Sequence, residues 1–339
     1  NDVYPLYAAS DIRSSSTERN KAINSDLKEQ LQLARTVLKK AHQLNNLPIL
    51  EETIFRLDNY YKVLKRKLIS GDEVTILEFL QTEVEPLMDN LEANISGFAA
   101  ETNGYKLQLD DNLGVVYKAR KDFEDSLTMI NEVTSSVLDE EEMKAQEMFP
   151  HFFEKYKTDG VEHNIYVGAS LSEKLKFDKV YLRNLRLWQL MVTVEIARKT
   201  ASMIRELPLP LETTHLILVH NAPLSIRFRM DEKKFDVDGA YNIRYEIIKK
   251  RIDKALIKDS DERVTQPGKI AIIYSQEKDA IEYMKYIEYL KAKDLLIGDL
   301  ENLELEELQG VNGLKALRIA VKIEKSSIMK EVEDILQKA

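Results

Sequence analysis

The sequence predicts an α+β protein, mostly α overall, in which an N-terminal helical bundle is followed by a mixed α/β domain. Apolar residues recur every three or four positions from about residue 14 to residue 157, which is typical of amphipathic helices. Segments with alternating or continuous apolar residues begin only after residue 160. A chain of 339 residues is also long enough for two domains. We therefore predict an acidic helical-bundle domain over residues 1–158 and a mixed α+β domain over residues 159–339.

Helices account for most of the first predicted domain. The serines of SSSTERNKAI offer an N-cap, and an apolar stripe follows at helical spacing. Further helices are expected near residues 50–68, over residues 73–100 and after residue 112. In the last of these, positions seven apart are apolar, but the matching inner positions include Ser126 and Glu140. A bundle face is therefore favoured over a coiled coil.

Strands and helices alternate in the second predicted domain. VEHNIYVGAS predicts a strand, and residues 178–206 predict a central helix whose apolar faces bury Trp188. THLILVH and PLSIRFRM flank Asn221-Ala222 and suggest a hairpin, although Pro223 argues against a tight turn. GKIAIIYS is apolar nearly throughout and predicts an interior strand. KDAIEYMKYIEYLKAK predicts a helix, and LKALRIAVKI alternates as a strand does.

Composition limits the partners and compartments that we expect. Cysteine is absent, which excludes disulfides, a thiolate nucleophile and cysteine-ligated metal sites. The net charge is −9, and residues 1–160 carry 19 Lys and Arg against 29 Asp and Glu, so no nucleic-acid partner is expected. No apolar run approaches the ~20 residues that span a bilayer, and no secretion-signal pattern opens the sequence. We expect a soluble, cytoplasmic protein with no membrane partner, processed or cut from a longer chain.

Familiar catalytic motifs are missing from the sequence. It contains no GxxxxGK[ST] phosphate loop, no GxGxxG after a strand, no GxSxG elbow and no HExxH zinc motif, which lowers the expectation of an enzyme. No metal site and no catalytic residue is predicted. His215 and His220 are five apart on a predicted strand and so face opposite sides. A calcium loop at DVDG would need carboxylates where Lys234 and Tyr245 stand. The sequence identifies no cofactor.

The best candidate for a binding site is the stretch from Ser225 to Glu246. A strand here places Arg227 and Arg229 on one face, where they could hold a carboxylate or a phosphate. A structural alternative stays open, in which the arginines pair with nearby aspartates in an internal charge network. The candidate ligand-binding residues are Arg227, Arg229, Asp236, Asp238, Tyr241, Arg244, His215 and His220.

Five segments of the sequence carry a resemblance to one family: LYAASDIRSSSTERNKAI, MFPHFFEKYKTDGVEHNIYVG, LRNLRLWQLM, FRMDEKKFDVDGAYNIRYEIIKKRIDKA and QPGKIAIIYSQ. Over nearly the whole chain, the sequence is similar to the C-terminal portion of large, uncharacterised bacterial proteins that contain a GAF domain. The resemblance implies a signalling or sensory context, with the ligand-sensing GAF domain mostly upstream of Asn1. It implies no activity and no site residues.

Three functions remain open from the sequence. The favoured interpretation is a non-enzymatic regulatory or signalling module, downstream of a sensory domain, that binds a small anionic ligand or a partner protein. The second is an enzyme acting on a phosphorylated or carboxylated small molecule, with Arg227 and Arg229 holding the anion. The third is a structural segment that forms a homo-oligomer. A pocket with converging Arg, His and Tyr side chains would favour the first two, and a large exposed apolar face would favour the third.

Overall fold

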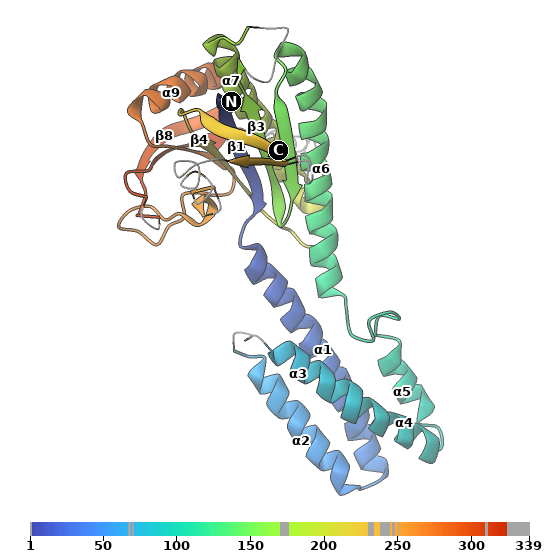
Figure 1. Ribbon diagram of the computed structural model, residues 1–339. Coiled ribbons are helices and arrows are strands. Elements are labelled where there is room, and N and C mark those ends of the chain that lie inside the picture. Colours follow the sequence, from blue (N-terminus) through green and yellow to red (C-terminus); the bar gives the residue numbers. More distant parts are fainter. Residues whose placement is uncertain are drawn as a thin grey trace, which may run out of the picture. The chain divides into compact units, whose positions relative to one another are not determined.

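A computed structural model describes residues 2–66, 69, 71–169, 176–229, 234–237, 245, 248–249, 251–308 and 311–323 (Figure 1). The protein is α+β, as the sequence predicted. It divides into two compact units. A helical unit comprises Ser14–Asp125, and a sheet unit comprises Asn1–Arg13 together with Ser126–Ala339.

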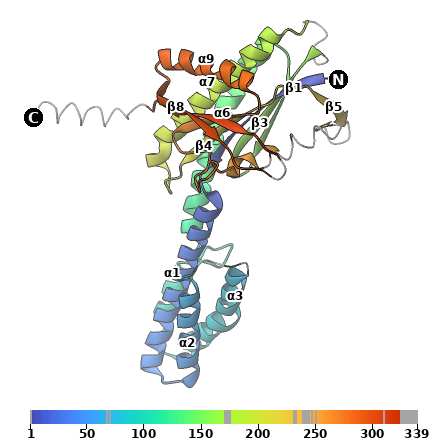
Figure 2. The ribbon, with the colours of Figure 1, turned by 90° about the vertical axis from the view of Figure 1, so that its left-hand side faces the viewer.

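The helical unit is built mainly from helices. Its elements are α1 (Ser15–Leu44), α2 (Pro48–Val63), α3 (Asp72–Phe79), a π-helical turn (Leu80–Val84), α4 (Glu85–Asn94) and α5 (Ala99–Lys106). Proline at the first position of α2 suits a helix start, because the N–H that it lacks would have no partner there. Leu27, Leu31 and Leu38 of α1 lie in one buried cluster with Leu50 and Leu57 of α2, and Figure 2 shows the two helices side by side.

A buried carboxylate fixes the start of the long helix α6 (Ala119–Met148). Asp26 on α1 is 1% exposed, and its two oxygens accept hydrogen bonds from the backbone N–H groups of Ala119 (2.8 Å) and Arg120 (3.0 Å). The Arg120 guanidinium donates to the same carboxylate at 3.1 Å and to Glu73 at 2.8 Å. Asp26 therefore caps the first turn of α6 and is itself neutralised.

The sheet unit is built on one mixed sheet. Its strands are β1 (Asp2–Ile12), β2 (Phe152–Lys157), β3 (Gly160–Val167), β4 (Thr213–Val219), β5 (Leu224–Arg229), β6 (Lys234–Val237), β7 (Lys269–Tyr274), β8 (Leu296–Glu304) and β9 (Lys315–Val321). The main order is β2-β3-β1-β4-β7-β9-β8, and β5 and β6 extend from the start of β1. β4 and β7 run parallel, and the other pairs in this order are antiparallel.

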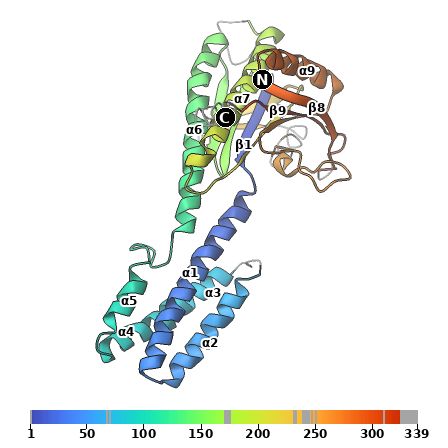
Figure 3. The same ribbon diagram turned by 180° about the vertical axis from the view of Figure 1, so that it is seen from behind.

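Helices cover one face of the sheet. α6 and α7 (Lys179–Met203) pack against β1 and β3, and α9 (Glu277–Ala292) packs beside α7 over β7 to β9 (Figures 1 and 3). Asp178 caps α7 by accepting a hydrogen bond from the Val180 N–H at 2.8 Å. Trp188 on α7 is 7% exposed, which confirms its predicted burial. The opposite face of the sheet is covered by residues of the connections after β6 and after β8, such as Ile252 and Leu314.

The position of β1 corrects the prediction that strands begin only after residue 160. β1 lies near the middle of the sheet, between β3 and β4, and β2 also precedes that residue. Residues on both faces of β1 are buried, for example Ala8 and Ala9, so no apolar alternation marks it as a strand. The compact units also differ from the predicted division at residue 158, because β1 joins the later strands and β2 pairs with β3 across that position.

A second correction concerns the hairpin expected between THLILVH and PLSIRFRM. Both segments form strands, β4 and β5, but they do not pair with each other. β4 is flanked by β1 on one side and by β7 on the other, so neither of its edges is available to β5. β5 instead pairs with Asp2 and Val3 of β1 and with β6. The interior position predicted for GKIAIIYS is confirmed, because β7 lies between β4 and β9.

Candidate functional site

The predicted ligand-binding residues that the structure describes lie on β4 or just after it, on β5 and on β6. Arg227 and Arg229 lie on β5 and Asp236 lies on β6, where the strand register pairs Arg227 with Asp236. An internal charge network requires these two positions to be neighbours, and the register makes them so. Both the charge network and the anion site stay predictions. The other three predicted residues of this stretch lie outside the described residues: Asp238, Tyr241 and Arg244.

The two candidate histidines lie on opposite sides of the sheet. His215 is 1% exposed on the helix-covered side, and its ring nitrogens are within hydrogen-bonding distance of Ser10 Oγ (2.9 Å) and Thr213 Oγ1 (3.1 Å). The His220 ring lies 5.0 Å from the ring of Tyr245, on the other side. Burial lowers the pKa of His215 to about 4, so it is neutral at physiological pH. The structure does not bring the two histidines to one site.

A different group of polar residues lies at the end of β1, on the face that the helices do not cover. Asp11 is half-buried there, and the carboxyl groups of Asp253, Glu162 and Asp159 lie close enough to repel its negative charge. Burial, followed by these three charges, raises the pKa of Asp11 from 3.8 to about 7. We call these four residues the Asp11 cluster. They come from β1, the β2–β3 turn, β3 and the connection before β7.

Glycine at position 160 makes the close packing of this cluster possible. Asp11 pairs with Gly160 across the β1–β3 ladder. A Cβ atom at Gly160 would lie 2.4 Å from the Ser10 carbonyl oxygen and 2.6 Å from both Cα and Oδ1 of Asp11. Any other residue would therefore displace the Asp11 carboxyl group or the strand. The two-residue turn Thr158-Asp159 that precedes Gly160 places Asp159 beside the same strand end.

Polar side chains continue along the same face from the Asp11 cluster. Directly paired residues of β1 and β3 share a face, and Glu162 and Asn164 alternate with Gly160 on that face of β3. Tyr7 Oη donates a hydrogen bond to Glu162 at 2.7 Å, and burial with the Glu162 charge raises the pKa of Tyr7. The Lys249 ammonium lies 5.5 Å from the centre of the Tyr7 ring.

Asn164 is the least satisfied polar side chain near the cluster. It pairs with Tyr7 across the ladder and is completely buried, yet neither its amide oxygen nor its amide nitrogen has a hydrogen-bond partner among the described residues. A buried amide in this state costs about 1–3 kcal/mol per unmade hydrogen bond. Asn164 could therefore offer both a donor and an acceptor to a polar ligand group that reached this face.

Sequence reasoning missed the Asp11 cluster because its members are far apart in the chain. The sequence predicts only a domain boundary at residues 158 and 159, and it predicts no strand at Asp11. A glycine next to an aspartate at the start of a strand was the available signal, since glycine in a strand often marks a close approach of other atoms. The partner of that approach could be found only from the strand order.

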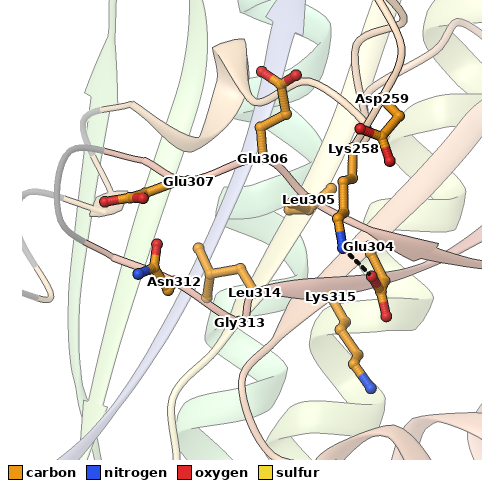
Figure 4. A pocket seen from close by; sticks show the side chains of 10 residues that line it. All are labelled: Lys258, Asp259, Glu304, Leu305, Glu306, Glu307, Asn312, Gly313, Leu314 and Lys315. Carbon is orange, nitrogen blue, oxygen red and sulfur yellow. Dashed lines mark hydrogen bonds and ion pairs between the residues drawn. The ribbon is translucent and has the colours of Figure 1, made fainter.

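A hollow of about 590 Å³ lies near the end of β8 and the start of β9 (Figure 4). Carboxylates outnumber ammonium groups around it, and its lysines already have partners: Lys258 lies 3.1 Å from Glu304, and Lys315 lies 2.6 Å from Glu277. Figure 4 shows the Glu306 and Glu307 side chains diverging from each other. These carboxylates are exposed, so water screens their charges, and no residue of the Asp11 cluster lines this hollow.

A three-ligand metal site and a membrane-spanning helix are both absent from the described part of the chain. No three His, Cys, Asp or Glu side chains there are arranged to hold one metal ion. A cation at the Asp11 cluster would therefore have at most two protein carboxylates and would need further ligands. Across the same residues, no helix has both the length and the apolar character needed to cross a membrane.

Comparisons with known proteins give a limited match. A family described as YeeD uncharacterised protein matches residues 21–134, which is about a third of the chain and lies mostly in the helical unit. No curated protein matches. The resemblance to GAF-domain-containing proteins stays a prediction.

Two solved structures are weakly similar to this chain. The guanylyl cyclase Cya2 is 16% identical with a TM-score of 0.28, and the match covers 58% of this chain and 83% of that chain. The adenylyl cyclase CyaB from P. aeruginosa is 12% identical with a TM-score of 0.32, and the match covers 57% and 83%. TM-scores this low do not support any inference about the function of this chain.

Proposed function

We propose that the sheet unit is a regulatory module that binds a phosphorylated small molecule through a divalent cation held at the Asp11 cluster. The observation that carries the proposal is the crowding of four carboxyl groups, with a pKa of about 7 for the Asp11 carboxyl. The charges that act on the Asp11 carboxyl are those of three other carboxyl groups. A divalent cation would favour the ionised carboxylates and remove the repulsion.

The choice of ligand class follows from the donors that are present. Mg²⁺ keeps several of its waters and is commonly held by one or two carboxylates together with phosphate oxygens of a ligand. Asp11 and Asp159, which flank the Gly160 contact, are the two carboxylates that we assign to the cation. Asn164 offers amide groups farther along the same face. A phosphate ester is therefore the ligand class that we propose, because it is anionic, as the sequence predicts, and it binds acidic side chains through a shared cation.

We assign a regulatory role, in preference to a catalytic one, because the sequence contains none of the four catalytic motifs considered above. One observation favours an enzyme as the second candidate. A carboxyl group with a pKa of about 7 is well suited to accept and return a proton at neutral pH. In that case Asp11 would act as general base on a phosphorylated or carboxylated substrate. The alternatives differ in whether the ligand is consumed.

The test is a ligand-dependent change in stability. Thermal unfolding is followed with MgCl₂ or MnCl₂, with inorganic pyrophosphate, and with both, starting from protein treated with EDTA. We expect the metal to raise Tm and pyrophosphate to raise it further only when metal is present. Stabilisation amounts to about 2.7 kcal/mol when the free ligand is a hundred times its Kd. Release of orthophosphate over time would favour the enzyme, and intact pyrophosphate the regulatory module.

Two variants decide whether the Asp11 cluster is responsible. Asp11→Asn should abolish the metal-dependent rise in Tm, because an amide is a much poorer ligand for a hard cation. Asp299→Asn is the matched control, since Asp299 is exposed on β8 and outside the cluster. An equal response in the Asp11→Asn variant, or no response in the parent protein, would contradict the proposal.

A further inference from the structure

A groove runs along the outer side of α7, away from the Asp11 cluster. Its volume is about 470 Å³. Its floor is apolar and includes Trp188 and Val192, and Met191 beside them is 42% exposed. The charged residues that line it are Glu141, Glu195, Arg198 and Lys199. An apolar floor with charged flanks suits the apolar face of an amphipathic helix.

The floor of the groove contains a polar atom without a partner. Trp188 is more than nine-tenths buried, and its indole N–H makes no hydrogen bond with the described residues. Buried indole N–H groups usually have an acceptor, and a buried donor without one costs about 1–3 kcal/mol. An occupant of the groove that supplied an acceptor would satisfy it.

The end of the described chain leads to the edge of this groove. After β9, the Lys322 N–H donates a hydrogen bond to the Leu295 carbonyl at 2.9 Å, and the Lys322 ammonium pairs with Asp294. Leu295 is one of the residues that line the groove. The described residues end at Ile323, directly after Lys322, and residues 324–339 follow in the sequence.

The sequence of this last segment matches the groove in pattern and in length. In EKSSIMKEVEDILQKA, the apolar residues fall at the spacing of one helix face: Ile328, Met329, Val332, Ile335 and Leu336. As a helix, the segment would be about 24 Å long, and α7 rises about 21 Å between Trp188 and Ser202 at 1.5 Å per residue. A short helix with one apolar face needs a surface to cover, because alone in water it is marginal.

We infer that residues 324–339 bind the α7 groove as an amphipathic helix and cover Trp188. The covalent tether raises the effective concentration of the segment at the groove to the millimolar range, which favours it over a second copy of the chain. This inference does not depend on the cation site, because none of the groove residues belongs to the Asp11 cluster.

Trp188 is the only tryptophan, so its fluorescence reports directly on the groove. The experiment compares the full chain with a chain that ends at Ile323, both checked by circular dichroism for an intact fold. Without the segment, emission should shift to longer wavelength and quenching by acrylamide should increase. A synthetic peptide of residues 324–339, added to the shortened chain, should reverse both changes. A peptide with Ile328→Asp and Ile335→Asp should not.

A variant of the full chain keeps the inference testable if the shortened chain fails to fold. Ile335→Asp with Leu336→Asp should give the same red shift as the truncation, and Lys338→Glu, off the apolar stripe, should not. Unchanged emission in the double variant would overturn the inference. Sedimentation tests whether a second copy of the chain covers the groove instead. A chain without residues 324–339 that is still a dimer, with Trp188 still protected from acrylamide, would show that a second copy does so. That result would also overturn the inference.

Discussion

Replacing Asp11 by asparagine should stabilise the protein in the absence of metal, and the gain should grow with pH. In the folded protein, the pKa of the Asp11 carboxyl is raised from 3.8 to about 7, because it is buried beside three other carboxyl groups. The folded state therefore holds this proton more tightly than the unfolded state does. The associated stability is fully present below about pH 4 and is lost as the pH rises through about 7.

The magnitude follows from the pKa shift. One pKa unit corresponds to about 1.4 kcal/mol, so a rise of about three units corresponds to roughly 4 kcal/mol of folding free energy lost between pH 4 and pH 8. Asparagine cannot ionise and avoids this loss. Relative to the parent protein, the free energy of unfolding of the Asp11→Asn variant should therefore increase by up to that amount over this pH range.

Urea denaturation in EDTA at several pH values measures the difference. Asp299→Asn, at an exposed position, should show a difference from the parent that hardly changes with pH. A difference between Asp11→Asn and the parent that stayed constant from about pH 4 to about pH 8 would refute the reasoning, since it would mean that Asp11 ionises equally in the folded and unfolded states. Saturating MgCl₂ should reduce or reverse the advantage of asparagine, because the cation then stabilises the ionised parent.

Three further predictions concern the stability of the two units. Trp188→Ala should lower the free energy of unfolding by about 3–5 kcal/mol in urea denaturation, because it removes a buried indole, and intact stability would contradict its place in the core. Burial lowers the pKa of His163 and of His215 to about 4. Each histidine should therefore cost roughly 3 kcal/mol of folding free energy as the pH falls from 6.5 to about 4. The His215→Gln variant should lose less stability than the parent over this range when denaturation is measured at several pH values. Asp26→Ala should cost about 3–5 kcal/mol, because it leaves the start of α6 uncapped and Arg120 without its buried partner; calorimetry showing an unchanged Tm would argue against that role.

The proposed binding site consists of groups that the strand order brings together. Asp11 and Asp159 are separated by almost 150 residues in the sequence, and neither belongs to a recognisable motif. Their proximity follows from the pairing of Asp11 with Gly160 between β1 and β3. The arginines that the sequence did single out, Arg227 and Arg229, lie on β5, which pairs with the other end of β1. The local sequence pattern thus identified polar residues, but it could not predict which of them lie close together in the fold.

The sequence alone determined those features that depend on neighbouring residues. Apolar spacing along one helix face predicted the helical character of most of residues 15–148 and the burial of Trp188 on α7, and a continuous apolar run predicted β7 as an interior strand. These predictions hold because helix periodicity and side-chain burial are set by residues within one or two turns, or within one strand.

Only the tertiary structure decided where β1 lies and what surrounds it. A strand buried on both faces has no alternating pattern, and its neighbours β3 and β4 are supplied by residues more than 140 positions later. The same pairing brings Asp11 against Gly160 and surrounds it with carboxyl groups from three other segments, which shifts its pKa. Charge repulsion and desolvation act through space and not along the chain, so the chemistry of this site followed from the fold.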